Sequence, residues 1–348
     1  MRRSSVILIV VLAMTAVIVG TAWWIGWSGN TPDFEGERAL HLPYGTDLEI
    51  ATDSLDARGL LQSRVTFVFV ARITRWGNQI KAGHYTFAAR QSNLDLLKKL
   101  RAGLQTPVSV MIPPGSTPGR VARSAARNMA FEADDFLAAL RNAALAAELE
   151  TDTLYLFSYM MPETYHFFWL TDAEGVVRRI KREFDTHYAR ELAEAAKERG
   201  LSQRELINLA AIVQWETNLN EEKARVAGVY LNRLRRSWPL QADPTIQYAL
   251  IEREGGMRRL FYRDYQIDHP YNTYQFKGLP PGPITNPSPS TLWGTANAES
   301  HDYMFFVAKP DGGHAFSVSL SAHNREAAKL HQYLRQRRNE KAAAAAES

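Results

Sequence analysis

The sequence predicts an α+β protein with one N-terminal transmembrane helix, a small α+β module and a larger, mostly helical domain. An uninterrupted apolar run near the N-terminus predicts the first part. Short strand patterns that alternate with helical ones predict the second, and long helical patterns in the rest of the chain predict the third. The length of 348 residues agrees with two folded domains.

The composition excludes several classes of protein. Hydrophobic residues make up 45% of the chain, which is enough to build cores and excludes a largely disordered protein. The 41 basic and 37 acidic residues are scattered along the chain, so we expect no nucleic-acid partner. Cysteine is absent, which excludes thiol catalysis, thiolate metal sites and disulfides. There is no glycine-rich phosphate loop and no nucleophile elbow, so nucleotide hydrolysis and serine acyl transfer lack their motifs.

The apolar run covers Val6–Trp27 and contains no charged residue. As a helix its 22 residues extend about 33 Å, enough to cross a bilayer. Two arginines precede the run and three tryptophans stand near its end, so we expect residues 1–5 in the cytoplasm and everything beyond 6–27 outside. The alternative is a cleaved signal peptide, but the run is longer than a usual signal core and lacks a clean cleavage site.

A short polar linker, residues 28–38, leads to a small module at 39–106. Its pattern predicts a strand, a turn and a helix in the first part, then a strand at Gly83–Phe87 and a helix at Asn93–Arg101.

The larger domain covers residues 107–333 and begins with a strand that turns into a helix. Helices are predicted at Glu132–Ala147 and Ala173–Arg199, the second stopped by Gly200. The tail, residues 334–348, has no apolar pattern beyond alanine, so we expect it to fray.

The most informative acid is Glu216. It lies on the first of two helices that are broken near Asn218–Asn220, and it follows the apolar positions Ile212 and Val213 at helical spacing. Its carboxyl is therefore expected to point toward the core, where burial raises the pKa and favours a general acid. The alternative is a structural ion pair with an arginine such as Arg233.

Two further stretches contain candidate ligand-binding residues. Gln241 and Asp243 could offer an amide and a carboxylate to a hydroxyl-rich ligand, although Asp243 followed by proline is also a good helix cap. The loop at 271–290 is rich in proline and glycine, and its tyrosines and amides suit sugar rings or plain scaffolding. The histidines of the C-terminal region lack the spacing of a zinc site, so we predict neither a metal nor a cofactor.

Four blocks of sequence resemble the MltG (YceG-like) family of endolytic murein transglycosylases, bacterial inner-membrane enzymes that cut the glycan strands of peptidoglycan. The blocks are LAAIVQWETNLNEEKARVAGVYLNRL, LQADPTIQYAL, YNTYQFKGLPPGPITNPSPSTLWGTANA and MFFVAKPDGGHAFSVSLSAHN, in that order. The segments KAGHYTF and VMIPPGST resemble the N-terminal LysM-like part of the family.

The resemblance implies a LysM-like module at 39–106 and a YceG-like catalytic domain at 107–333, held outside the bacterial inner membrane. It implies a catalytic carboxylate at Glu216, the acid that helical periodicity places toward the core. It further implies a substrate cleft formed by Asn232, Gln241, Asp243, Tyr271, Asn272, Tyr274, His314 and His323. Cell-wall synthases are the protein partners that the family suggests.

The implied reaction is that of a lyase. It cleaves the β-1,4 bond between N-acetylmuramic acid and N-acetylglucosamine and leaves 1,6-anhydro ends, with Glu216 as the single acid and base. Two alternatives stay open. One is a hydrolytic muramidase that uses Asp243 as a second carboxylate. The other is a tethered peptidoglycan-binding module without catalysis, suggested by Gln214, Phe157 and the LysM-like region. Gln214, Phe157 and Ser158 stand where the family usually has Glu, Glu and Gly.

Overall fold

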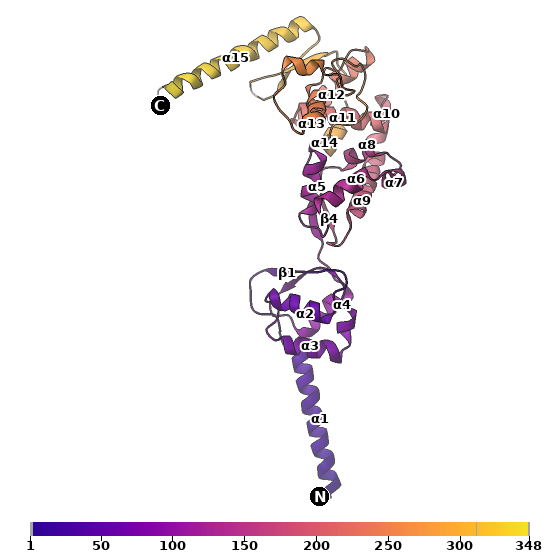
Figure 1. The fold of residues 1–348 in the computed structure, drawn as a ribbon, viewed down its shortest axis with the longest axis vertical. Helices are drawn as coiled ribbons and strands as arrows, with labels where there is room; N and C mark the ends of the chain where they lie inside the picture. The colour runs from indigo at the N-terminus through magenta and orange to yellow at the C-terminus, as the bar shows by residue number, and fades with distance from the viewer. Residues whose placement is uncertain (1–2, 311, 347–348) are drawn as a thin grey trace. The chain divides into compact units, whose positions relative to one another are not determined.

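The structure is a computed structural model that describes residues 3–310 and 312–346 (Figure 1). Across these residues it is mostly helical, with three two-stranded sheets. The chain divides into two compact units. The first comprises Met1–Val110, Ala126–Glu132 and Tyr165–Asp172, and the second comprises Met111–Ala125, Ala133–Thr164 and Ala173–Ser348.

The first helix, α1 (Arg3–Trp27), contains the apolar run, which is long and apolar enough to cross a membrane. Most of the apolar run is exposed, and only its C-terminal end, at Gly26, is buried against the rest of the protein. At the C-terminal end of α1, Ile25 packs against the core of the first unit. The Asn93 side chain donates a hydrogen bond to the Ile25 carbonyl at 3.0 Å. The helix is thereby joined directly to this unit.

The first unit surrounds one antiparallel pair of strands with helices. The pair and the helices around it are β1 (Glu37–Leu42), α2 (Leu48–Ala57), α3 (Arg64–Ile73), η1 (Trp76–Gln79), β2 (Gly83–Ala88) and α4 (Asn93–Ala102). The β1–β2 register runs from Glu37 opposite Ala88 to Leu42 opposite Gly83. Ser92 caps α4 in a capping box, and Gly103 ends it in the left-handed conformation that glycine adopts without strain.

The next part of the chain is mainly helical. Its elements are β3 (Val108–Met111), α5 (Pro118–Ala126), α6 (Ala133–Arg141), α7 (Ala143–Glu148), α8 (Thr153–Leu156), η2 (Phe157–Tyr159), β4 (Thr164–Phe167), α9 (Ala173–His187), the π-helical η3 (Tyr188–Leu192) and α10 (Ala193–Glu198). The single helix predicted at Glu132–Ala147 is divided because the Asn142 side chain accepts hydrogen bonds from the backbone of Ala144 and Leu145 and caps α7.

The remaining elements position the candidate site. They are α11 (Gln203–Glu216), α12 (Asn220–Arg235), α13 (Asp243–Glu254), η4 (Tyr262–Gln266), α14 (Pro289–Ala296), β5 (Phe305–Ala308), β6 (His314–Ser317) and α15 (Leu320–Ala346). Helix α15 continues through the tail that was expected to fray, because alanine has the highest helix propensity of all residues.

Helix α11 is the buried centre of the second unit. Ser202 and Glu205 form a capping box at its start, and Leu206–Val213 is buried without interruption. It packs against α12 and α14. The helix ends at Glu216 because Thr217 adopts an extended backbone, and α12 begins at Asn220. The predicted break between these two helices is confirmed.

Candidate active site

Glu216 is the last residue of α11, and its side chain is only partly exposed. The Tyr230 hydroxyl on α12 donates a hydrogen bond to Glu216 Oε1. The carboxyl faces a cavity, yet enough protein surrounds it that loss of hydration raises its pKa to about 7. The Tyr230 hydrogen bond and the Arg233 charge oppose this rise, whereas the charge of Asp243 adds to it. Glu216 is therefore an acid that holds its proton near neutral pH.

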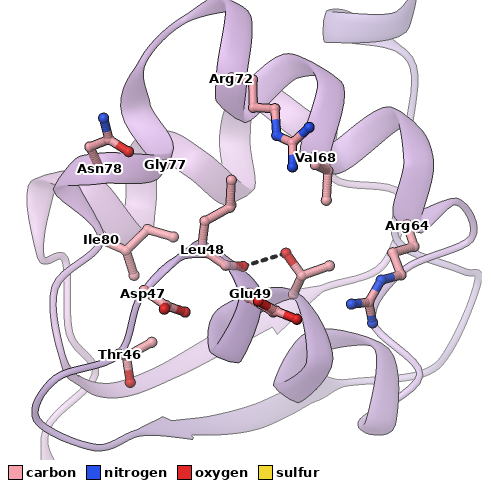
Figure 2. Close-up of a pocket in the computed structure, with 11 residues that line it drawn as sticks. Thr46, Asp47, Leu48, Glu49, Arg64, Val68, Arg72, Gly77, Asn78 and Ile80 are labelled. Carbon is pink, nitrogen blue, oxygen red and sulfur yellow. Dashed lines mark hydrogen bonds between the residues drawn. The ribbon is translucent and has the colours of Figure 1, made fainter.

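The cavity has a volume of about 320 Å³ and is lined by residues from four helices, one strand and two loops. Its lining consists of Glu216, Tyr230, Arg233, Gln241, Asp243, Tyr274, Phe305, Phe306, Leu320 and His323. A larger hollow, about 620 Å³, lies in the first unit between α2 and α3 (Figure 2). The charged side chains of that hollow are exposed, so it offers no buried acid.

Arg233 lies one helical turn after Tyr230 on α12 and is 7% exposed. Its guanidinium donates hydrogen bonds to the carbonyls of Leu240 and Met304, the latter at 2.9 Å. These bonds hold the arginine in place, and the described structure gives it no ion pair with Glu216. Arg233 therefore lowers the pKa of Glu216 through its charge. It does not form the structural ion pair with Glu216 that was the alternative to a catalytic role.

Asp243 is the first residue of α13, and its carboxylate is held by two tyrosines. Tyr274 donates a hydrogen bond to Oδ1, and Tyr265 donates one to Oδ2 at 3.4 Å. The residue that caps α13 is Ala242, which makes no side-chain capping bond. The Asp243 carboxylate is therefore part of the cavity wall and does not cap the helix.

Gln241 has a positive φ of 50°, which is uncommon for a residue other than glycine. Two hydrogen bonds from the backbone to Thr273, in the loop at 271–290, hold this conformation. The Gln241 N–H donates to the Thr273 carbonyl and the Ala242 N–H donates to the Thr273 hydroxyl, both at 3.0 Å. Strained backbone that is held in this way is frequent at functional sites. It places the Gln241 amide at the cavity beside Asp243.

His323 approaches the cavity from α15. Burial lowers its pKa, and the positive charge of Arg233 lowers it further, so the ring is neutral at pH 7. The ring stacks on Phe305 with 5.5 Å between centroids. Its Nδ1 atom is buried and has no hydrogen-bond partner in the part of the chain that is described. His323 thus contributes a neutral imidazole to the cavity lining.

The structure places Asn232 and Asn272 outside the cavity lining. The Asn232 side chain donates to the carbonyls of His301 and Tyr303, at 2.7 and 2.9 Å. The Asn272 side chain is fully buried and donates to two carbonyls of the 265–267 segment. Both amides hold the loops around the site.

Tyr271 and His314 also lie outside the cavity lining. Tyr271 is buried, and its ring lies 4.5 Å from that of Tyr248. His314 pairs through Nδ1 with Glu222 Oε2 at 2.6 Å, and its backbone N–H donates to the same carboxylate. The His314 ring lies perpendicular to that of Phe306, which does line the cavity, with 5.4 Å between the ring centroids.

The positions that depart from the family pattern also lie outside the cavity lining. Gln214 Oε1 accepts hydrogen bonds from the Ser288 N–H and the Thr291 hydroxyl, each at 2.8 Å, and so anchors the start of α14. Ser158 lies with Phe157 in the short helix η2, is buried, and donates to the Tyr155 carbonyl of α8 at 2.6 Å.

Sequence reasoning did not assign Tyr230, Arg233, Phe305, Phe306 or Leu320 to the site. The first two had a usable signal, because polar groups three positions apart share one face of a helix that is otherwise buried. The other three come from β5 and the start of α15, and only the tertiary fold brings these segments to Glu216.

Comparison with known proteins gives consistent matches. The model of the YceG-like family matches residues 40–329. The endolytic murein transglycosylase of Bacillus subtilis (strain 168) is 25% identical over 328 residues, which cover 89% of this chain and 90% of that protein. The enzyme of the same name from Streptococcus pneumoniae (strain D39) is 27% identical over 307 residues, and the match covers 79% of this chain but only 55% of that protein.

A solved structure supports the fold. The crystal structure of a YceG-like protein from Listeria monocytogenes superimposes with a TM-score of 0.57 at 24% identity. The match covers 84% of this chain and 99% of that one.

Proposed function

The chain belongs to the YceG-like family, and from that membership we propose that it is an endolytic murein transglycosylase that cuts the glycan strands of peptidoglycan. The relatives of that name support the reaction class. The observation that carries the proposal is the Glu216 carboxyl, whose pKa is raised to about 7 inside a cavity lined by polar and aromatic groups.

In the first step, Glu216 donates its proton to the glycosidic oxygen between N-acetylmuramic acid and N-acetylglucosamine. The bond from this oxygen to the muramyl C1 carbon breaks, and the N-acetylglucosamine part leaves with a free hydroxyl. A general acid works best when its pKa lies near the working pH, because it then both holds and releases its proton. The raised pKa of Glu216 meets this condition.

In the second step, the Glu216 carboxylate removes the proton from the muramyl C6 hydroxyl, whose oxygen bonds to C1. The product is a 1,6-anhydro ring, Glu216 regains its proton, and no water is consumed. Between the two steps the carboxylate is stabilised by the hydrogen bond from Tyr230 and by the charge of Arg233.

Asp243 is proposed to stabilise the positive charge that develops at C1 when the glycosidic bond breaks. Two tyrosines fix its carboxylate at the cavity. A second carboxylate is also what a hydrolase uses to activate water or to form a covalent intermediate, so a hydrolytic muramidase is the second candidate. The ends of the products separate the two reactions, because hydrolysis leaves free reducing ends.

The test is digestion of isolated glycan strands by the full chain in detergent, with the product ends identified by mass spectrometry. We expect anhydro-muramyl ends from the parent and none from Glu216→Gln. The matched control is Glu221→Gln, an exposed glutamate at the start of α12 that does not line the cavity. Reducing ends would support the muramidase. Strands that are bound but left intact would support a tethered binding module.

We also propose that α1 anchors the protein in the bacterial inner membrane, with residues 1–5 in the cytoplasm and the rest outside. In this arrangement residues 39–106 form a LysM-like module and residues 107–333 the catalytic domain, and cell-wall synthases work on the same strands. The apolar length of α1 and its preceding arginines support the anchor. Because the chain lacks cysteine, labelling of single introduced cysteines with an impermeant maleimide in whole cells tests the topology.

A further inference from the structure

Helix α3 has an apolar stripe on its outer surface. Val65, Phe69 and Ile73 are 78%, 44% and 62% exposed, and their spacing of four residues places them along one side of the helix. The core-facing side of the same helix carries Phe67 and Val70, which are buried. Helix α3 is therefore apolar on two sides. The fold buries the inner side and leaves the outer side exposed.

The stripe is separate from the neighbouring hollow. Arg64, Val68 and Arg72, on a third side of α3, line the hollow that this helix shares with α2 (Figure 2). None of the stripe residues lines it. A ligand in the hollow would therefore leave the stripe uncovered.

Helix α3 is fixed beside the end of the apolar helix α1, as Figure 1 shows. Asn30, which lies just beyond α1, is buried and bonds twice to Ser63, the residue that caps α3. Its side-chain N–H donates to the Ser63 carbonyl at 3.0 Å, and its side-chain oxygen accepts from the Ser63 N–H at 2.8 Å. The Asn30 amide also donates to Asn93, which bonds to the Ile25 carbonyl of α1.

We propose that the α3 stripe lies in the headgroup region of the same bilayer that α1 crosses, so that the first unit contacts the membrane at two points. This inference rests on the proposed membrane anchoring by α1. The hydrogen bonds between Asn30 and Ser63 hold α3 beside the end of the apolar run of α1. At this level of the membrane, the headgroup region, amphipathic helices insert their apolar side. Trp23, Trp24 and Trp27 near the end of α1 mark the same interfacial level.

Two arginines near the end of α3 give the contact its lipid preference. Arg72 and Arg75 are exposed, and within residues 3–310 and 312–346 neither guanidinium has an ion-pair partner. Beside a stripe that enters the headgroup layer, they pair with lipid phosphates and with anionic headgroups. A second copy of the chain or another protein could also cover an apolar stripe, so the test must separate lipid from protein contact.

The test uses spin labels on single introduced cysteines, which the cysteine-free chain allows without background. The full chain is reconstituted into vesicles of phosphatidylcholine and phosphatidylglycerol, with labels at Val65, Ile73, Tyr44 or Met14. Tyr44 is the matched control, because it is a large aromatic residue that is 77% exposed and follows β1 in the same unit. Met14 lies inside the apolar run of α1. Accessibility to oxygen and to a water-soluble nickel chelate distinguishes lipid from water.

We expect labels at Val65 and Ile73 to be several-fold more accessible to oxygen than to the nickel chelate, as at Met14, and the Tyr44 label to show the reverse. If Met14 is in lipid but Val65 and Ile73 match Tyr44, the proposed contact is wrong while the anchor stands. If Met14 is in water, the anchoring itself fails. Labels at Val65 and Ile73 that are shielded from both reagents show a protein contact and overturn the lipid assignment.

The contribution of Arg72 and Arg75 to the lipid contact is tested by changing the lipid composition of the vesicles. Replacing phosphatidylglycerol by phosphatidylcholine is expected to shift the Ile73 label toward water, because Arg72 and Arg75 then lose their anionic partners. If the Ile73 label is equally accessible in both kinds of vesicle, the proposed preference for anionic lipids is wrong.

Discussion

The hydroxyl of Tyr230 and the carboxyl of Glu216 form a hydrogen bond between consecutive helices, α11 and α12. The bond favours the ionised form of the acid, whereas burial disfavours it more strongly. The two effects together leave the pKa of Glu216 at about 7, lower than burial alone would set it. Tyr230 is therefore a positioning residue whose removal changes the acidity of its neighbour.

Tyr230→Phe removes the hydroxyl that stabilises the Glu216 carboxylate. The pKa of Glu216 is expected to rise, so the alkaline limb of the pH–rate profile moves to higher pH. The ionised acid also loses a hydrogen bond to a charged group, worth roughly 1.5–3 kcal/mol, so turnover falls by about ten-fold or more. Turnover of labelled glycan strands between pH 5 and 9 checks both effects. Lower turnover with an unmoved alkaline limb would contradict the assigned role.

Glu216→Gln is expected to change the dependence of stability on pH. In the unfolded chain the carboxyl ionises near its ordinary pKa of 4.5, whereas the folded protein holds the proton to about pH 7. The parent therefore loses stability as the pH rises from 4.5 to 7, by up to roughly 3 kcal/mol, and the cost is constant above that range. Glutamine does not titrate and avoids this loss.

The melting temperature of Glu216→Gln relative to the parent should accordingly increase from pH 5 to pH 8, by several degrees. Glu221→Gln, which changes an exposed glutamate, serves as the control. A constant difference between variant and parent across this range would show that Glu216 does not carry a raised pKa.

Arg233→Met is expected to destabilise the second unit. The change leaves the carbonyls of Leu240 and Met304 without their hydrogen-bond donor, which costs roughly 1–3 kcal/mol for each buried group left unpaired. It also removes a positive charge that lowers the pKa of Glu216, so the alkaline limb should again move upward. Thermal unfolding and the pH–rate profile measure the two effects. The control is Arg236→Met, an exposed arginine at the end of α12; equal effects of both changes would refute the argument.

Gln214→Glu restores the residue that is usual in the family, and we expect turnover within about two-fold of the parent. The side-chain oxygen that accepts from Ser288 and Thr291 is present in both residues, and it lies outside the cavity lining. Gln214→Leu loses both bonds and should cost about 1–2 kcal/mol of stability. A large gain in turnover for Gln214→Glu would show instead that this position takes part in the reaction.

Much of the local structure was predictable from the sequence. Helical periodicity located α11 and α12 with the break between them, because the apolar stripe and the polar residues that interrupt it are local features. The strand at Gly83 and the helix at Asn93 were also predicted, since capping and alternation are encoded within a few residues. The division of the helix at Asn142 was missed, because alanine-rich sequence on both sides hides a side-chain cap.

Within the candidate site, the sequence by itself determined that Glu216 ends a buried helical stripe, and it indicated Gln241 and Asp243 as polar residues of the same region. Only the tertiary structure decided their partners. Tyr230 reaches Glu216 because α12 folds back on α11, and Tyr274 reaches Asp243 across 31 positions of the chain. The physical reason is that a pKa and a cavity depend on surrounding atoms, which distant segments supply, whereas periodicity reports only which side of an element is buried.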